Sequence, residues 1–328
     1  MESPQILKQS KLIYYIRCYM SMLMPRWVSR MWRSQILAQF DTLPQSEQEA
    51  ITDRVNYYCR LQPKGATSQL PQSAKRLGDH NLRAPRKYAS VYFYDTAKYT
   101  RCFDPQLRWD YRMGDVTTVP STPSIVKSRP LCSDNQNSVM LKLNKVRHYI
   151  FVKDTIPFEQ KRDMAVFRGS VKHKPNRIDF VARFYNHPLC DAGETYSNIE
   201  TLPAESKKPP ISVLEHLQYK FIMALEGVDV ASNLKWVMSS NSVAVMPRPT
   251  CETWFMEGRL IPNHHYIEVA PDFSDFEERI EYYLDHPEEA KQIARNANAY
   301  VAQFRDQVRE EIISLMVMQR YFEMTRQL

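Results

Sequence analysis

The second half of the chain alternates short apolar runs with segments of helical pattern. The apolar runs are predicted to be strands, near residues 164–168, 219–224, 242–246 and 265–269. The segments that follow them are predicted to be helices, near residues 176–186, 229–240, 250–258 and 274–284. Strands and helices in this order form a parallel sheet covered by helices. The pattern therefore places the chain in the α/β class.

The junction after the first of these strands is a candidate binding element. Apolar residues run directly into Arg168-Gly169-Ser170, and Arg177 follows near the start of the next helical segment. A tight turn before a helix presents backbone N–H groups, and an arginine makes bidentate contacts with phosphate oxygens. The junction indicates an anion site, although turns of this composition also serve as plain connections.

A second junction of the same kind follows the next strand. The turn Glu226-Gly227-Val228-Asp229 leads into a segment of helical pattern, where Asp229 is predicted to be the N-cap residue. The polar side chains expected in the first turns of this helix, near the positive end of its dipole, are Ser232, Asn233 and Lys235. A capped helix with a solvent-exposed lysine is the alternative.

The composition and net charge indicate which classes of binding partner to expect. The chain has 328 residues, of which 43% are hydrophobic and 25% charged, and this is ordinary for a globular protein. With 44 Lys and Arg against 37 Asp and Glu, the net charge is +7, so we expect an anionic partner. Nucleic acid, acidic lipid and a sugar nucleotide all qualify. The cations are spread without a run of five, so we expect no nucleic acid partner and keep a basic nucleic-acid-binding protein as the non-enzyme alternative.

Residues 1–61 are predicted to form a helical extension. Residues 5–40 suggest one or two helices broken near Pro25, and a further helix is expected from Ser46 to Leu61. One side of the first part is apolar and contains Ile6, Ile13, Ile16, Met20, Leu23, Trp27 and Met31. The cations gather opposite, with Arg17 as the exception. This pattern suits either peripheral contact with an anionic membrane or a helix packed on the protein's own core.

Four further segments complete the expected organisation. Residues 62–87 are predicted to be an exposed basic loop, either solvated or holding a phosphorylated acceptor, and residues 88–157 an amino-terminal α/β domain. Strands are expected there at Val91–Tyr94, Pro123–Val126 and His148–Val152. Residues 158–286 are expected to form the nucleotide-sugar-binding α/β domain, and residues 287–328 helices that pack across the domains.

Six cysteines lie far apart without a Cys-x-x-Cys pair, so we expect free thiols in a reducing cytoplasm. We also expect no secretory signal and no membrane span. The sequence has no Asp-x-Asp triplet and no histidine pair at metal spacing, so no metal cofactor is expected.

The order and spacing of four segments resemble glycosyltransferase family 90, and above all its bacterial lipopolysaccharide-core branch. The segments are Phe167–Ser170, Glu226–Val228 with Ser232–Lys235, Ser242–Val245, and His265–Val269 ahead of Asp272–Asp275. The resemblance implies a GT-B-like fold, in which two Rossmann-type domains face a cleft. It also implies an inverting, metal-independent transfer of a sugar of glucose, galactose or xylose type from a UDP-sugar to a lipopolysaccharide-core or related glycan.

The resemblance assigns roles to single residues. The donor is expected to contact Arg168, Gly169, Ser170, Arg177, Gly227, Val228, Ser232, Asn233, Lys235 and Glu252. Eukaryotic relatives have an arginine where this chain has Asn233, so Lys235 or the two arginines must compensate. Asp115 is the expected general base, with Asp110 in reserve, and Lys127 and Arg129 could line the same cleft.

The resemblance also leaves the acceptor open. A lipid-linked saccharide at the inner face of the inner membrane is favoured, which makes the protein cytoplasmic and possibly peripheral on that membrane. A protein or capsule acceptor with the same donor chemistry is the alternative.

Overall fold

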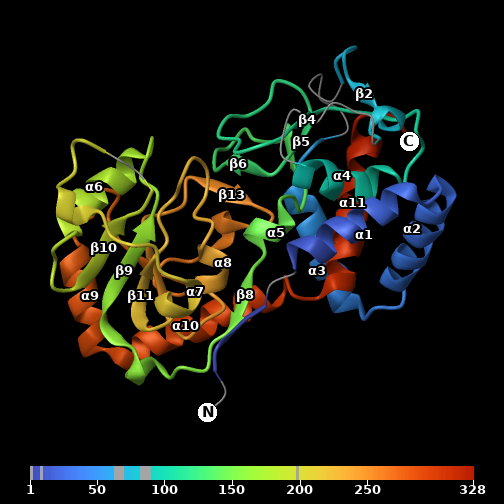
Figure 1. Ribbon diagram of the computed structural model, residues 1–328. Coiled ribbons are helices and arrows are strands. Elements are labelled where there is room, and N and C mark those ends of the chain that lie inside the picture. Colours follow the sequence, from blue (N-terminus) through green and yellow to red (C-terminus); the bar gives the residue numbers. More distant parts are fainter. Residues whose placement is uncertain (1–2, 8–9, 63–69, 82–89, 197–198) are drawn as a thin grey trace. The chain divides into compact units, whose positions relative to one another are not determined.

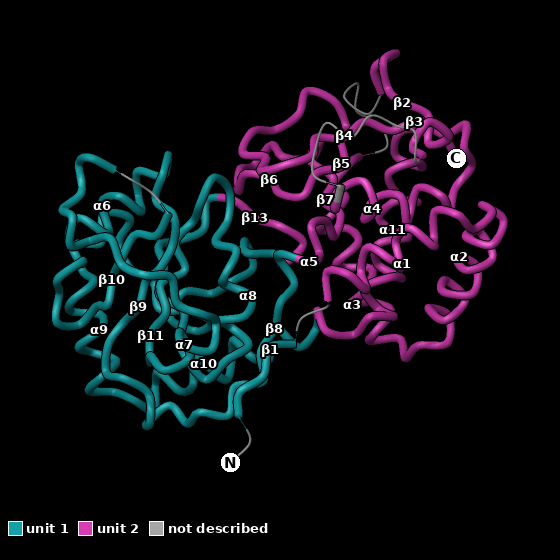
Figure 2. The backbone as a smooth tube through the Cα atoms, viewed as in Figure 1, with its two compact units in different colours: residues 1–8, 147–250, 256–303 teal, residues 9–146, 251–255, 304–328 magenta. Residues whose placement is uncertain are grey.

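The computed structural model describes residues 3–7, 10–62, 70–81, 90–196 and 199–328. The chain divides into two compact units (Figure 2). Unit 1 comprises residues 1–8, 147–250 and 256–303, and unit 2 comprises residues 9–146, 251–255 and 304–328. Both units mix helices with strands. The division does not test whether the five segments expected from the sequence fold as separate domains.

Unit 1 is built on a five-stranded parallel sheet with the order β10-β9-β11-β12-β14 (Figure 1). Its strands are β9 (Arg162–Gly169), β10 (Cys190–Glu194), β11 (Tyr219–Met223), β12 (Val243–Met246) and β14 (Ile267–Glu268). All residues of β11 and β12 are buried, as expected for strands covered on both faces. The four strands predicted for this half are confirmed as β9, β11, β12 and β14, and β10 is a strand that the sequence did not predict.

The helices of unit 1 surround a core of aromatic and aliphatic side chains. They are α6 (Pro175–Phe184), α7 (Val213–His216), α8 (Leu234–Val237), α9 (Phe276–Asp285) and α10 (Pro287–Ala302), with short 3₁₀ turns at Phe158–Gln160, Ala204–Ser206 and Glu257–Arg259. Phe180 of α6 and Phe276 of α9 are fully buried, with their ring centroids 5.6 Å apart. Pro175 begins α6, where its fixed φ and missing N–H carry no cost. Outside the main sheet, β1 (Gln5–Leu7) pairs antiparallel with β8 (Phe151–Lys153).

Unit 2 consists mainly of helices. They are α1 (Lys11–Leu23), α2 (Arg26–Phe40), α3 (Gln45–Tyr58), α4 (Ser90–Thr100) and α11 (Gln307–Met324), with a 3₁₀ turn at Leu77–Asp79. Its small sheets are parallel β4-β5-β7 (Tyr111–Arg112, Ser124–Val126, Ser138–Met140), antiparallel β13-β6 (Cys251–Thr253, Ser128–Pro130) and antiparallel β2-β3 (Lys75–Arg76, Arg108–Trp109). The short helix α5 (Lys145–His148) lies where the chain leaves unit 2 for unit 1.

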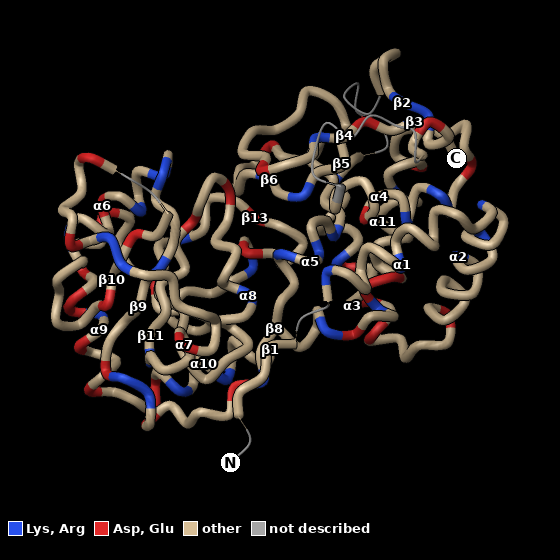
Figure 3. The backbone as a smooth tube through the Cα atoms, in the orientation of Figure 1, with Lys and Arg blue, Asp and Glu red and all other residues tan. Residues whose placement is uncertain are grey.

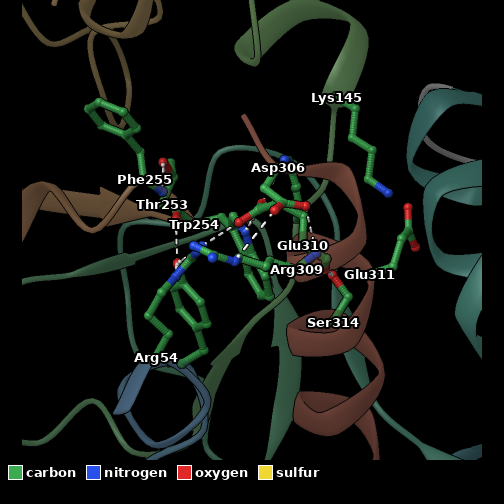
Figure 4. Close-up of polar contacts among 12 residues, drawn as sticks. Arg54, Lys145, Thr253, Trp254, Phe255, Asp306, Arg309, Glu310, Glu311 and Ser314 are labelled. Atoms are coloured by element: carbon green, nitrogen blue, oxygen red, sulfur yellow. Dashed lines mark hydrogen bonds and ion pairs between the residues drawn. The ribbon is translucent and has the colours of Figure 1, made fainter. Parts of the chain in front are cut away.

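A buried charge network lies inside unit 2 (Figure 4). The carboxylate of Glu310, in α11, accepts hydrogen bonds from Arg54 Nη2 at 2.6 Å, Lys142 Nζ at 2.6 Å and Trp254 Nε1 at 2.7 Å. The ring of Trp254 stacks on Tyr58 of α3, with centroids 3.9 Å apart. One carboxylate therefore connects α3, α11 and the strand β13.

Several local predictions are wrong. Val91–Tyr94 lies in α4, where all four residues are buried, because packing in the core of unit 2 outweighs their β propensity. The helix expected at 250–258 is replaced by β13, which pairs with β6, and by a turn in which Met256 has a φ of 56°. Residues 5–7, expected to be helical, form the strand β1. The helices expected at 287–328 are present as α10 and α11.

Other predictions agree with the structure. The helix expected at 46–61 is α3, and the break expected near Pro25 separates α1 from α2. Six cysteines are free thiols, as expected. Much of the basic loop at 62–87 lies outside the described residues. Among the helices that the structure describes, none has the length and apolar character that crossing a bilayer requires.

Candidate active site

The strand order of unit 1 marks one point on its sheet. The first strand, β9, has the second, β10, on one side and the third, β11, on the other. The connection from β9 to β10 and the connection from β10 to β11 therefore run in opposite directions across the sheet. The gap between β9 and β11 is a topological switch point. In parallel sheets ligands bind outside the carboxyl ends of the strands at such a point. The segments that leave these ends are Ser170 onward and Ala224–Gly227.

Arg177 connects the two segments. Its guanidinium donates hydrogen bonds to three backbone carbonyl oxygens, those of Ser170 at 3.1 Å, Leu225 at 2.7 Å and Glu226 at 3.0 Å. A Cβ added to Gly169 would lie 3.7 Å from Nη1, and one added to Gly227 would lie 3.4 Å from Nη2. The structure thus brings both predicted junctions to one guanidinium.

The guanidinium of Arg177 is held by carbonyl oxygens. Among the residues that the structure describes, the hydrogen-bond partners of its side chain are carbonyls, and no carboxylate pairs with it. Burial, and then the neighbouring cation Arg147, lower the pKa of Arg177 to about 10. The side chain stays charged at neutral pH. Carbonyl oxygens orient a guanidinium without neutralising it, so this edge of the sheet favours an anion.

Arg168, by contrast, has an acidic partner. Its Nη2 lies 2.7 Å from Oδ1 of Asp191 in β10, and its Nη1 donates to the carbonyl of Asp191. The same carboxylate accepts from Lys208 at 3.0 Å and from the hydroxyl of Tyr219 at 2.7 Å. In this arrangement Arg168 stabilises Asp191, and a direct contact with the donor diphosphate stays a prediction.

The second junction has a different local structure from the one expected. The helix α8 begins at Leu234 and has only four residues, so Asp229 is not its N-cap; its carboxylate accepts from the adjacent N–H of Val230 at 2.7 Å. A one-turn helix also has little macrodipole. Asn233 donates to the carbonyl of Met223 at 2.9 Å and so holds the end of β11.

The remaining side chains of this junction differ in exposure. Lys235 is fully buried, with its Nζ 3.0 Å from Oε1 of the buried Glu257, so it must leave that carboxylate to reach a ligand. Ser232 is half-buried, and Val228 is 58% exposed beside Gly227. The binding roles assigned to all three stay predictions.

A third segment reaches the same edge through Thr250, a residue to which the sequence analysis assigned no role. Glu226 accepts from the N–H of Thr250 at 2.9 Å and from its hydroxyl at 2.6 Å. Thr250 follows β12, so the ends of β11 and β12 are joined next to Gly227. The signal was present, because Thr250 lies four residues beyond a predicted strand whose end belongs to the same edge.

Comparison with known proteins identifies the family. The model of glycosyl transferase family 90 matches residues 136–325, which is more than half of the chain and includes all the strands of the unit 1 sheet. The chain belongs to glycosyltransferase family 90. Membership makes it a glycosyltransferase.

The chain is also similar to individual proteins. The chain is 39% identical to the O-glucosyltransferase LpsA of Dichelobacter nodosus over 318 residues, which cover 96% of each protein. It is 27% identical to the uncharacterized protein 179R of Invertebrate iridescent virus 6 over 56% of this chain and 19% of that protein. It is 24% identical to the protein O-glucosyltransferase 1 of Rattus norvegicus over 44% of this chain and 38% of that protein.

The other residues predicted for this family 90 enzyme lie in unit 2. Asp115, on the loop after β4, pairs with Lys127, and its side chain is 34% exposed. Asp110 accepts from the hydroxyl of Thr122 at 3.2 Å and from its neighbour's N–H at 2.9 Å, so it organises the turn before β5. Asp115 is the more accessible carboxylate, and its role as base stays a prediction.

Glu252 is enclosed in unit 2. Its side chain is fully buried, Oε1 accepts from Nε of Arg129 at 2.8 Å, and Oε2 accepts from the hydroxyl of Tyr57. Arg129 in turn donates to the carbonyl of Tyr57 at 2.8 Å. These contacts fix the β6-β13 pair to the end of α3. Glu252 and Arg129 can therefore act on a substrate only after this network opens.

Proposed function

We propose that this family 90 enzyme transfers a sugar of glucose, galactose or xylose type from a UDP-sugar to a hydroxyl of a lipopolysaccharide-core or related glycan. The reaction inverts the anomeric centre and uses no divalent metal ion. Unit 1 binds the donor, unit 2 supplies the acceptor side, and the two form a GT-B pair. The similarity to the O-glucosyltransferase LpsA of Dichelobacter nodosus favours glucose as the sugar and oxygen as the acceptor atom.

One observation carries the proposal. The guanidinium of Arg177, which has no carboxylate partner among the described residues, lies between Ser170 and Glu226 at the switch point of a parallel sheet. When a sugar leaves UDP, negative charge grows on the diphosphate. A fixed cation and nearby backbone N–H groups lower the energy of that charge without reorganising during the reaction.

The acceptor hydroxyl must lose a proton as it attacks. Asp115 is the proposed base, because it is a partly exposed carboxylate on a loop of unit 2, where it pairs with Lys127. The acceptor is proposed to be lipid-linked and to meet the enzyme at the cytoplasmic face of the inner membrane. A protein or capsule acceptor would use the same donor site, so a panel of acceptors separates these alternatives.

Donor binding is tested by thermal unfolding with a panel of UDP- and GDP-sugars. A ligand at a hundred times its Kd stabilises the native state by about 2.7 kcal/mol, so the correct donor raises Tm clearly. UDP-glucose is expected to stabilise, and GDP-mannose is not. Stabilisation by GDP-sugars alone would contradict the proposal.

Metal use is tested separately with EDTA present during transfer. We expect transfer to continue in EDTA, because protein cations and N–H groups act on the diphosphate. Transfer that EDTA abolishes and Mn²⁺ restores would overturn this part of the proposal. The stereochemical outcome is read from the anomeric proton of the product by NMR.

A further inference from the structure

The helix α1 is anchored in unit 2 by one side only. Tyr14 and Met22 are buried, with 5% and 6% of their surfaces exposed. The hydroxyl of Tyr14 donates to Asp95 of α4 at 2.7 Å and thereby fixes the rotation of α1 about its axis. The opposite side of the helix therefore has a defined direction, away from the core of the unit.

That opposite side is apolar and exposed. Its side chains, which we call the α1 stripe, are between 48% and 70% exposed, and they are Leu12, Ile13, Ile16, Tyr19, Met20 and Leu23. Leu12, Ile16 and Leu23 recur at intervals of four and seven residues, so they share one face of the helix. Beyond Pro25, Trp27 is 61% exposed and Met31 is 53% exposed. A surface helix normally turns polar residues outward, and this helix is apolar on both sides.

The sequence around the α1 stripe contains basic residues and no acidic ones. From Ser3 to Phe40 the sequence contains six Lys and Arg residues and no Asp or Glu. Lys11, Arg17 and Arg30 are exposed, and within the described part of the chain no carboxylate pairs with any of them. Lys and Arg positions elsewhere are distributed over both units together with Asp and Glu (Figure 3). An acid-free segment of this length therefore sets α1 and α2 apart.

We propose that the α1 stripe, assisted by the exposed cations Lys11 and Arg17 of the same helix, docks in the interface of an anionic lipid bilayer. Leucine, isoleucine and methionine enter the acyl boundary, and tyrosine and tryptophan remain at headgroup depth. The cations meet lipid phosphates. The helix lies along the surface, because its 13 residues span only about 20 Å against a hydrocarbon core of about 30 Å.

A second copy of the chain fits the same surface less well. In a two-fold dimer the patch meets itself, so Lys11 and Arg17 would face cations of the other copy without an acidic residue to pair with. A bilayer rich in phosphatidylglycerol or lipid phosphate offers apolar depth and negative charge together. This inference concerns a surface of unit 2 and does not depend on the proposed donor or acceptor.

Sedimentation with lipid vesicles tests the inference. One vesicle contains phosphatidylcholine alone, and the other contains phosphatidylcholine and phosphatidylglycerol in a ratio of two to one. The apolar variant is Ile16→Glu, and its matched control is Ile261→Glu, because both isoleucines are 54% exposed and Ile261 lies in unit 1. The charge variant is Arg17→Glu, with Arg295→Glu on α10 as control.

The wild type is expected to bind the anionic vesicles and to bind the neutral ones weakly. Ile16→Glu should lower the partition coefficient at least about tenfold, and Arg17→Glu about fivefold or more, while both controls bind like the wild type. Thermal unfolding verifies that each variant is folded.

Two results overturn the inference. One is equal vesicle binding by Ile16→Glu and Ile261→Glu. The other is a wild type that ignores vesicles but sediments as a dimer that Ile16→Glu dissociates, which would assign the α1 stripe to self-association.

Discussion

Nη2 of Arg177 lies 2.7 Å from the carbonyl oxygen of Leu225 and ties the first turn of α6 to the end of β11. The same guanidinium holds the carbonyls of Ser170 and Glu226. One side chain therefore organises the two turns between which the donor diphosphate is proposed to bind, and also contributes the positive charge there. Its structural and electrostatic contributions can be separated by substitution.

Arg177→Ala is expected to lower the free energy of unfolding by about 2–4 kcal/mol, because the carbonyls of the buried Leu225 and the half-buried Ser170 and Glu226 lose their donor. Arg177→Lys keeps the charge but cannot reach three acceptors, so it should recover part of the UDP affinity and little of the stability. Urea unfolding and UDP titration measure the two effects.

The control for this pair is Arg183→Ala. Arg183 lies on the same helix, is exposed, and donates to one carbonyl, that of Asp272 at 2.6 Å. Arg183→Ala should change neither the free energy of unfolding nor the free energy of UDP binding by more than about 0.5 kcal/mol. If Arg177→Ala behaved like Arg183→Ala, the guanidinium would have no organising role.

Glu310→Gln is expected to destabilise unit 2 strongly. The carboxylate accepts from Arg54 and Lys142 in a buried site, and an amide would remove the negative charge with which both cations pair. Breaking a buried ion pair in this way costs about 3–5 kcal/mol. Urea unfolding measures the loss, and Glu323→Gln, at an exposed position of the same helix, is the matched control. A loss of less than about 1 kcal/mol would show that the network is dispensable.

Stability should fall at acid pH because of Asp191. Burial alone would raise the pKa of this carboxylate, but hydrogen bonds from Arg168, Tyr219 and Lys208 lower it to about 2. A folded-state pKa below the unfolded value of about 3.9 means that the stabilisation is complete above that pH and is lost as the pH falls toward 2.

The control for this pH effect is Asp191→Asn. Unfolding free energy measured from pH 5 to pH 2 should fall less steeply in this variant than in the wild type. Equal slopes would mean that other carboxylates cause the acid sensitivity.

Asp115→Asn is expected to lower kcat by about 100- to 10,000-fold, the range for loss of a general base. UDP affinity should hardly change, because the donor site is proposed to lie in unit 1. Asp134→Asn, on an exposed loop of unit 2, should keep full activity. Turnover retained by Asp115→Asn would move the base to another carboxylate, and Asp110→Asn is then the next variant.

Much of unit 1 could be predicted because its signals are local. Buried parallel strands are continuous apolar runs, so β9, β11, β12 and β14 are visible in the sequence. The junctions at Gly169 and Gly227 follow such runs directly. Asp191 lies in β10, whose sequence Cys-Asp-Ala-Gly-Glu has no apolar run, and that strand was missed because pairing with β9 alone defines it.

The amino-acid sequence by itself determined the α/β class of the second half, the family, and the glycines and cations of the donor region. Tertiary structure alone decided which cations are neutralised. Arg168 meets Asp191 and Lys235 meets Glu257, whereas the described partners of Arg177 are carbonyls. Charge pairing depends on residues that are distant in the sequence and adjacent in space. A local sequence pattern therefore does not reveal which charges pair.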